Sequence, residues 1–267
     1  MTTKGTLRRI TPDELSEILT QVRQEGHREL ILLGPDVWLK PLLEDWPDEF
    51  KDRSIFELTE FVVDLTERLL DLKHLQSLIL WSNKISDSEV RAITEHLTNL
   101  TSLNLAGNSI SEAGARAIAE HLTGLTSLDL RTNNIGESGA RAIAEHLTSL
   151  TSLNLAGNGI GEAGARVIAK HLNQLTSLNL DINKIGYAGA QTIAQNLARL
   201  TTLNLGDAGA KAIAEHLPQL TSLKLPDNQI SDAGARAIGE NLTQLTSLYL
   251  WMNSIGETGA KVIGENL

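Results

Sequence analysis

Five histidines recur at one position of a repeating sequence, and histidine is a residue type that binds metal ions and transfers protons. They are His96, His121, His146, His171 and His216. A zinc site needs ligands that converge at about 2 Å on a single ion. Each of these histidines instead falls near the end of a predicted helix, where a cation interacts favourably with the helix dipole. We therefore predict a structural role for the column, with no metal and no cofactor.

Hydroxyl groups recur in a second column and raise the question of nucleophilic catalysis. The column consists of Ser77, Ser102, Ser127, Ser152, Ser177, Thr202, Ser222 and Ser247. A serine nucleophile requires a histidine and an acid within hydrogen-bonding reach, and the histidines are predicted to lie on the opposite surface. The sequence has no cysteine, and we find no phosphate-binding, dinucleotide-binding or zinc-peptidase motif. These patterns indicate that the chain is not an enzyme.

The overall charge and hydrophobicity restrict the classes of partner. The formal net charge is -10 at pH 7, whereas binding to nucleic acid or to anionic membrane requires a basic surface. No apolar run approaches the roughly 18 residues of a membrane-spanning helix, and the first ten residues do not resemble a signal peptide. We expect a cytoplasmic protein that binds neither nucleic acid nor membrane; delivery into a host cell is an alternative location.

These residue columns are positioned by an internal repeat. Its units begin at Leu75, Leu100, Leu125, Leu150, Leu175, Leu200, Leu220 and Leu245, so the period is 25 residues except in the sixth unit, which has 20. A fixed period of this length is typical of stacked supersecondary units.

Each unit predicts a strand, a turn and a helix. Leu103 and Leu105 alternate with polar residues, as expected for a strand with one buried face. Residues 112–122 carry apolar side chains at helical spacing, and Ser111 is a suitable N-cap. Small residues such as Gly114 allow the helices to pack closely. Eight such units predict an α/β solenoid.

An asparagine column marks the turn after each strand. It consists of Asn83, Asn108, Asn133, Asn158, Asn183, Asn228 and Asn253. Asparagine in a tight turn can bond to backbone groups that would otherwise be buried without a partner. We interpret this column as a structural ladder.

Segments such as LTSLNLAGNSISEAGARAIAEHL, at residues 100–122, resemble the ribonuclease-inhibitor-like class of leucine-rich repeats. The resemblance covers residues 75–267 and implies a horseshoe with a parallel β-sheet on the concave side and α-helices on the convex side. Relatives of that class include inhibitors, innate-immune sensors, GTPase activators and bacterial effectors. The units here are shorter than is usual for the class, and their LTxLTxL phrasing is similar to bacterial internalin-like repeats, which favours a bacterial source.

Residues 1–74 lack the period and are expected to form a mainly helical N-terminal cap. Thr11 and Glu14 predict one helix start, and Ser54 with Glu57 predicts a second helix that runs to Leu69. Residues 28–33 resemble the strand half of a repeat, so the sheet is expected to begin there. The cap also holds most of the aromatic residues, which we expect to plug the open end of the solenoid, with a ligand pocket as the alternative. They are Trp38, Trp46, Phe50 and Phe56.

The repeat domain, residues 75–267, has two irregular features. No C-terminal cap follows the last helix, so Leu248, Leu250 and Ile263 are expected to be partly open beside an unpaired strand edge. Either the chain belongs to a longer protein, or this end associates with a second copy to form a homodimer. The sixth unit runs from Leu205 directly into a helix, which predicts a break in the asparagine ladder and a local change in curvature.

Residues between the strand leucines should point to the concave face, where they can contact a partner. Aromatic residues and arginine are enriched at binding hot spots, and both ends of this face carry aromatic side chains. The predicted binding residues are Trp81, Ile79, Arg131, Asp181, Tyr249, Trp251 and Met252.

The sequence therefore predicts a protein–protein interaction module that binds a protein partner through its concave face. One alternative is the sensor or scaffold segment of a larger signalling protein or bacterial effector. A second is a solenoid that assembles through its C-terminal end. The resemblance also implies the alternative of a GTPase activator, in which Arg131 would lie near a nucleotide. The catalytic loop of such activators is missing from this sequence.

Overall fold

The computed structural model describes residues 7–25, 27–33, 55–58, 68–205, 210–225 and 230–267. Strands and helices alternate along almost the whole of this part. The strands are β1 (Leu7–Ile10), β2 (Glu29–Leu33), β3 (Ile55–Leu58), β4 (Ser77–Trp81), β5 (Ser102–Asn104), β6 (Ser127–Asp129), β7 (Ser152–Asn154), β8 (Ser177–Asn179), β9 (Thr202–Asn204), β10 (Ser222–Lys224) and β11 (Ser247–Tyr249). The helices are α1 (Pro12–Glu25), α3 (Asp87–His96), α4 (Glu112–His121), α5 (Gly136–His146), α6 (Gly161–His171), α7 (Gly186–Asn196), α8 (Ala210–His216), α9 (Asp232–Asn241) and α10 (Glu257–Asn266).

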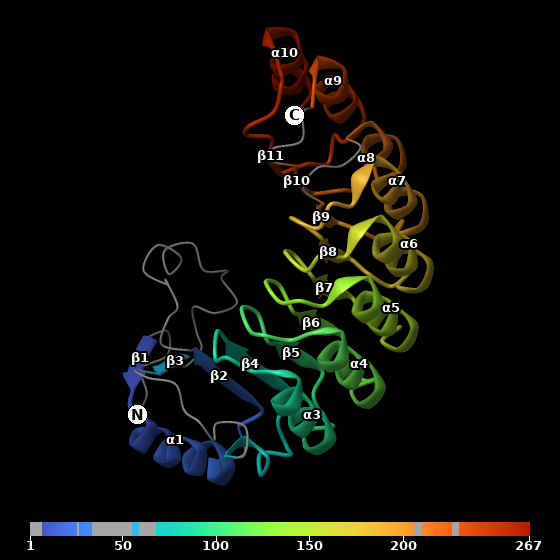
Figure 1. The fold of residues 1–267 in the computed structure, drawn as a ribbon. Helices are drawn as coiled ribbons and strands as arrows, with labels where there is room; N and C mark the ends of the chain where they lie inside the picture. The colour runs from blue at the N-terminus through green and yellow to red at the C-terminus, as the bar shows by residue number, and fades with distance from the viewer. Residues whose placement is uncertain (1–6, 26, 34–54, 59–67, 206–209, 226–229) are drawn as a thin grey trace.

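The described strands form one parallel sheet in the order β1-β3-β2-β4 and then sequentially to β11. Neighbouring repeat strands pair with equivalent residues, so that Ser102 lies opposite Ser127. The sheet follows the concave side of a curved array and helices α3–α10 follow the convex side (Figure 1). The predicted α/β solenoid is confirmed.

The N-terminal segment contributes more strand than expected. Glu29–Leu33 is a strand, as predicted for residues 28–33, and it pairs with β4. The Thr11–Glu14 capping box is present. The sheet does not begin there, however, because β3 and β1 extend it further. Ile55–Leu58 is a strand, so the prediction of a helix starting at Ser54 is wrong for these residues: parallel partners on both sides supply backbone hydrogen bonds that outweigh a local capping signal. Trp38, Trp46 and Phe50 lie outside the described residues.

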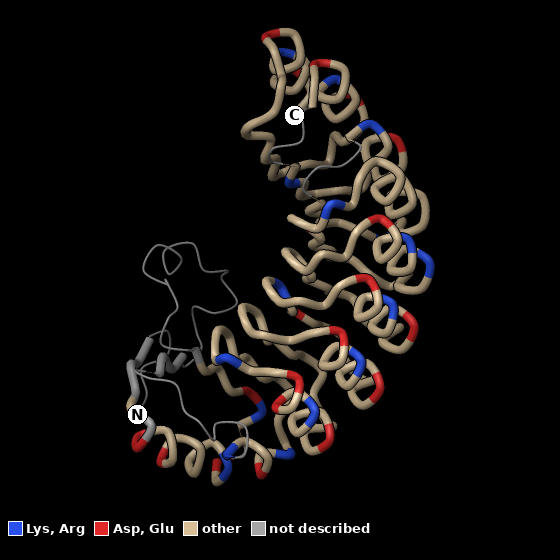
Figure 2. The backbone as a smooth tube through the Cα atoms, viewed as in Figure 1, with Lys and Arg blue, Asp and Glu red and all other residues tan. Residues whose placement is uncertain are grey.

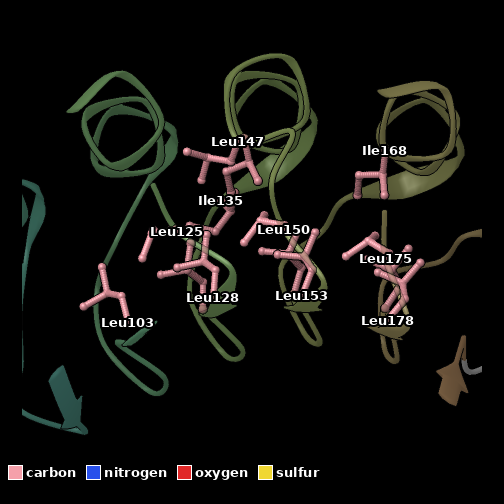
Figure 3. Close-up of a cluster of buried hydrophobic side chains, with 14 of the residues drawn as sticks. Leu103, Leu125, Leu128, Ile135, Leu147, Leu150, Leu153, Ile168, Leu175 and Leu178 are labelled. Carbon is pink, nitrogen blue, oxygen red and sulfur yellow. The ribbon is translucent and has the colours of Figure 1, made fainter. Parts of the chain in front are cut away.

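Aliphatic side chains fill the space between the sheet and the helices. Leu103 in β5 and Leu105 directly after it are fully buried, as are their counterparts in the following repeats as far as the one that contains β10. Figure 3 shows Leu103 and its counterparts Leu128, Leu153 and Leu178 on the side of the strands that faces the helices. Helix packing is tight, because a Cβ atom at Gly139 would come within 3.0 Å of the Ala115 Cβ on the preceding helix. In the last coil Leu248, Leu250 and Ile263 are only partly buried.

Asparagine side chains connect the turns of adjacent coils. The Asn108 side-chain amide donates to the backbone carbonyls of Leu80 and Leu105, at 2.9 and 2.8 Å. Its Oδ1 accepts the backbone N–H groups of Asn83 and Ile85, both at 2.9 Å. Related bonds are made by Asn133, Asn158, Asn183 and Asn253. Asn228 lies outside the described residues.

The short sixth repeat keeps its place in the sheet. Strand β10 pairs with β9 through Ser222 opposite Thr202, a separation of 20 residues instead of 25. The ladder break that we predict falls at residues 206–209, which the structure does not describe. On the strand side the array is therefore continuous.

Candidate binding surface

Asn104, Asn154, Asn179 and Asn204 occupy equivalent positions at the ends of their strands on the concave side. In Asn104, Asn154 and Asn179 the side-chain oxygen accepts the backbone N–H two residues ahead, at 2.9, 3.2 and 3.0 Å. Such bonds hold the side chain against the strand. Carboxamide groups therefore form a half-buried row along the sheet.

Asp129 places a carboxylate in this row. Its Oδ1 accepts the Arg131 N–H at 3.0 Å, as an asparagine would, and its Oδ2 faces the amides of Asn104 and Asn154 at 3.4 and 3.3 Å. Burial raises the pKa of the Asp129 carboxyl above its ordinary value, and the positive charge of Arg131 opposes that rise. The charged form of Asp129 is therefore disfavoured in the folded state relative to the unfolded chain, even with Arg131 beside it.

We expect Asp129→Asn to raise the free energy of unfolding at neutral pH. A carboxyl with a raised pKa holds its proton more tightly in the folded state, so stability falls as pH rises from the ordinary value of 3.8 through the raised pKa. Asparagine does not ionise and can still accept the Arg131 N–H. Thermal unfolding between about pH 3 and pH 8 should show a gain that disappears at acid pH. A less stable variant at neutral pH would show instead that the attraction of Arg131 dominates.

Trp81 and Arg131 meet on the concave side although they belong to coils two apart. The guanidinium carbon lies 4.7 Å from the centroid of the Trp81 ring, which is a cation–π contact. The ring also lies against Gly107 of the coil between them, where an added Cβ would be 3.1 Å from the indole nitrogen. The Arg131 Nε lies 3.6 Å from Asp129 Oδ2. The structure thus joins two predicted binding residues into one cluster with Asp129.

A second aromatic group lies at the other end of the repeats. Tyr249, Trp251 and Met252 are 47%, 59% and 68% exposed. The ammonium group of Lys224 lies 4.9 Å from the centroid of the Tyr249 ring. This group at β11 is separated from the Trp81–Arg131 cluster by the intervening strands of the array (Figure 1).

Family models with the description leucine-rich repeat match much of the chain. One matches residues 73–135 and 98–160, and another matches residues 171–194 and 216–239. The chain is a leucine-rich-repeat protein. No curated protein matches its sequence.

Solved structures share the fold of this leucine-rich-repeat protein. An internalin, InlF of Listeria monocytogenes, matches with a TM-score of 0.58 at 27% identity, over 77% of this chain and 56% of that chain. A match to the Rad7–Elc1 complex of yeast has a TM-score of 0.61 at 14% identity, over 96% and 68%. The ectodomain of the Arabidopsis receptor kinase HAESA, bound to a peptide hormone, has a TM-score of 0.52 at 23% identity, over 70% and 32%. This chain spans less than two thirds of the internalin and HAESA chains.

Two other predicted binding residues lie apart from both aromatic groups. Ile79 is buried, so the expectation that it offers surface to a partner is not met in this structure. Asp181 is half-buried, and its carboxylate accepts the N–H of Ile182 at 3.0 Å. The acidic side chain is therefore engaged with the turn that follows β8.

Ile182 is a surface residue that sequence reasoning missed. It is 77% exposed and has a φ of 54°, a left-handed conformation that is costly for a β-branched residue. The equivalent residues in the two preceding repeats are Thr132 and Gly157, and both also have a positive φ. Comparison of the repeats would have identified the exposed position, because glycine alternates there with larger residues.

Threonines form another ladder that the sequence reasoning did not assign. The hydroxyl of each donates to the backbone carbonyl of the equivalent residue one coil earlier, at 3.1 or 3.2 Å. The donors are Thr101, Thr126, Thr151, Thr176, Thr201, Thr221 and Thr246. The ladder crosses the short repeat without interruption and fixes the start of every repeat strand from β5 onward.

The histidine column makes contacts within its own helices. The Nδ1–H group of His121 donates to the carbonyl of Ala117 at 2.9 Å, and His96, His146 and His216 make the same bond. Asn196 and Asn241 occupy this position in other repeats and donate in the same way through Nδ2. Within the described part of the chain, no group of three His, Cys, Asp or Glu residues could hold a metal ion.

Charged residues concentrate along the convex helices, as the coloured backbone in Figure 2 shows. Several are paired within one helix, such as Arg116 with Glu112 at 3.4 Å and Arg166 with Glu162 at 2.7 Å. Exposed pairs of this kind contribute little to stability. No helix in the described residues is long and apolar enough to cross a membrane. The concave side is therefore the less charged side of the repeat array, and its charges are located at a few positions.

Proposed function

We propose that this leucine-rich-repeat protein binds a protein partner through its concave face. Leucine-rich repeats commonly mediate protein–protein interaction. The observation that carries the proposal is the Trp81–Arg131 stack, in which two residue types enriched at binding hot spots meet on the concave side. A standard interface buries on the order of 800 Å² on each partner, an area that a curved sheet of this length can provide.

The exposed group at Tyr249, Trp251 and Met252 extends the proposed surface toward the last coil. Large apolar side chains at this exposure indicate a contact surface when they lie together. A partner that reaches both aromatic groups would follow the sheet from β4 to β11. The small side chains between them, such as Ala156, leave room for it.

Site-specific photo-crosslinking tests the proposal. A photoreactive residue would replace Ala156 on the concave side or Ala163 on the convex helix α6, two alanines of the same repeat. In cells that naturally produce the chain, we expect one protein to crosslink from position 156 and not from position 163. Excess unlabelled protein should compete, whereas a Trp81→Ser, Trp251→Ser double variant should not. Equal products from both faces, or no product from position 156, would exclude concave binding.

A second candidate function is self-association through the last coil. The specific observation is that Trp251 and Met252 are exposed beside β11, which pairs with β10 on one side only among the described strands. An unpaired strand edge is a template for another strand. A chain that serves as a sensor or scaffold segment of a larger protein would use the same concave surface, with its activity outside these residues.

Trp251→Ser tests self-association. If the last coil forms a homodimer, light scattering should give twice the chain mass for the native protein and the chain mass for the variant. Both measurements should cover about a hundredfold range of concentration. Monomers in both cases would exclude the homodimer and leave the aromatic group free for a different protein.

A further inference from the structure

The guanidinium group of Arg131 is oriented by two neighbours, Trp81 and Asp129, and Gly107 leaves room for the first of them. Trp81 supports its face, with 4.7 Å between the guanidinium carbon and the ring centroid. Asp129 Oδ2 faces the Nε atom at 3.6 Å. Gly107 leaves the space in which the indole lies, since a Cβ there would approach the indole nitrogen to 3.1 Å. A side chain restrained in this way loses little entropy when it binds.

The two terminal nitrogens of Arg131 remain available. Within the described residues its one ion pair is the Nε contact with Asp129, and its side chain is 38% exposed. A guanidinium presents five N–H groups in a planar fork, and its two terminal nitrogens match the two oxygens of a carboxylate. The two terminal nitrogens of Arg131 can therefore donate a pair of hydrogen bonds to a ligand.

The presence of an aspartate at position 129 is better explained by its contact with Arg131 than by the backbone hydrogen bond that it makes at the end of its strand. Asn104 and Asn154 occupy equivalent positions and accept the same type of backbone N–H without any charge. The second oxygen of Asp129 gives what an asparagine oxygen does not, a negative charge facing Arg131 Nε. Asp129 is thus a positioning residue for Arg131, retained although burial disfavours its charge.

We propose that the terminal nitrogens of Arg131 bind a carboxylate group of the protein partner, with Trp81 as the supporting platform. This inference rests on the proposed function for the identity of the ligand as a protein. The carboxylate belongs either to an Asp or Glu side chain or to the C-terminus of the partner. The two sources share the same bidentate chemistry and differ in what lies next to the carboxylate.

Small-molecule titrations followed by NMR test the site without the partner. The probes are N-acetylglutamate α-amide for a side-chain carboxylate, N-acetylalanine for a C-terminal one, and N-acetylglutamine amide as the neutral control. We expect the indole N–H resonance of Trp81, assigned by its loss in Trp81→Phe, to shift saturably with a carboxylate and not with the neutral probe. The probe that binds more tightly identifies the source. A shift that is equal for all three probes, or no saturable shift with either carboxylate, would overturn the proposal.

Variants at Arg131 separate charge from geometry. Arg131→Gln should abolish the saturable shift. Arg131→Lys keeps the charge but loses the fork, so its affinity should fall at least about fivefold. In Asp129→Asn the indole resonance should move even without probe, because the guanidinium that stacks on Trp81 loses its contact with the carboxylate. Unchanged titrations in Arg131→Gln would place the bound carboxylate elsewhere.

A matched pair of glycine variants tests the supporting platform. Gly107 and Gly157 have φ angles of 66° and 67°, so alanine is strained equally at both. At Gly157 the nearest atoms to an added Cβ are 3.8 Å away, whereas at Gly107 the indole of Trp81 is in the way. Gly107→Ala should weaken carboxylate binding several-fold while Gly157→Ala should not; equal affinities would refute the role of the platform. If carboxylate probes bind but position 156 gives no crosslink, the proposed function is contradicted and the carboxylate site is retained. If position 156 crosslinks but no carboxylate probe binds, only the carboxylate site is contradicted.

Discussion

Asn183→Ala is expected to lower the free energy of unfolding by about 4 kcal/mol, the largest effect that we expect of any single substitution considered. The Asn183 side chain is buried and makes five hydrogen bonds to backbone groups. Its amide donates to the carbonyls of Leu155, Leu180 and Asp181, at 2.8, 3.0 and 3.0 Å. Its oxygen accepts the N–H groups of Asn158 and Ile160, at 2.9 and 3.1 Å. Alanine would remove all five bonds at a site where water has little access, and of the five backbone groups the Asp181 carbonyl would keep the bond from the Gly157 N–H.

Urea unfolding measures this loss, and Asn179→Ala is the matched control from the same coil. Asn179 is half-buried, and the one hydrogen bond resolved for its side chain is to the N–H of Asp181. We expect the control to cost about 1 kcal/mol. If the two variants lose similar stability, the ladder bonds are not what holds adjacent coils together.

Asp87→Ala is expected to cost about 2 kcal/mol, because Asp87 caps a helix of the next coil. Its Oδ1 accepts the N–H groups of Ser111 and Gly114, at 2.8 and 3.0 Å, and its Oδ2 accepts the Ser111 hydroxyl. These are donors at the start of α4, which has no partner for them within its own first turn. Asp232 makes the same contact with Gly256 and Gly259.

The equivalent position one repeat later supplies the control for Asp87. Glu112 is exposed and pairs with Arg116 on its own helix at 3.4 Å, so Glu112→Ala should cost no more than about 0.5 kcal/mol. Thermal unfolding of the two variants compares an acid that links coils with one that does not. Equal losses would mean that the Asp87 contacts add nothing to helix capping.

The repeat fold could be predicted from the sequence because each coil is a local structure. Within 25 residues the alternation at Leu103 and Leu105 predicts a strand, and Asn108 predicts a turn. Stacking then brings equivalent residues together, as in Ser102 opposite Ser127. A column in the sequence is therefore a column in space, and both aromatic ends of the concave face could be found by aligning the repeats.

Contacts between residues at different positions of the repeat could not be predicted by aligning the repeats. Trp81 reaches past Gly107 to Arg131, and Asp87 reaches from one coil to the helix start of the next. Both depend on side-chain direction and on a small neighbour, which the period does not encode. The burial of Ile79 is of the same kind, since it depends on the environment of one strand and not on the repeat.

The N-terminal segment contains both a feature that the sequence alone predicts and one that depends on tertiary contacts. Thr11 and Glu14 form a capping box within four residues, and the sequence alone determines it. Ile55–Leu58 carries a similar helix signal but becomes β3, inserted between β1 and β2. The sequence thus determines those features whose hydrogen bonds close within one coil or repeat from coil to coil. Tertiary structure decides the rest, because a strand with no periodic neighbour takes its partners from segments far along the chain.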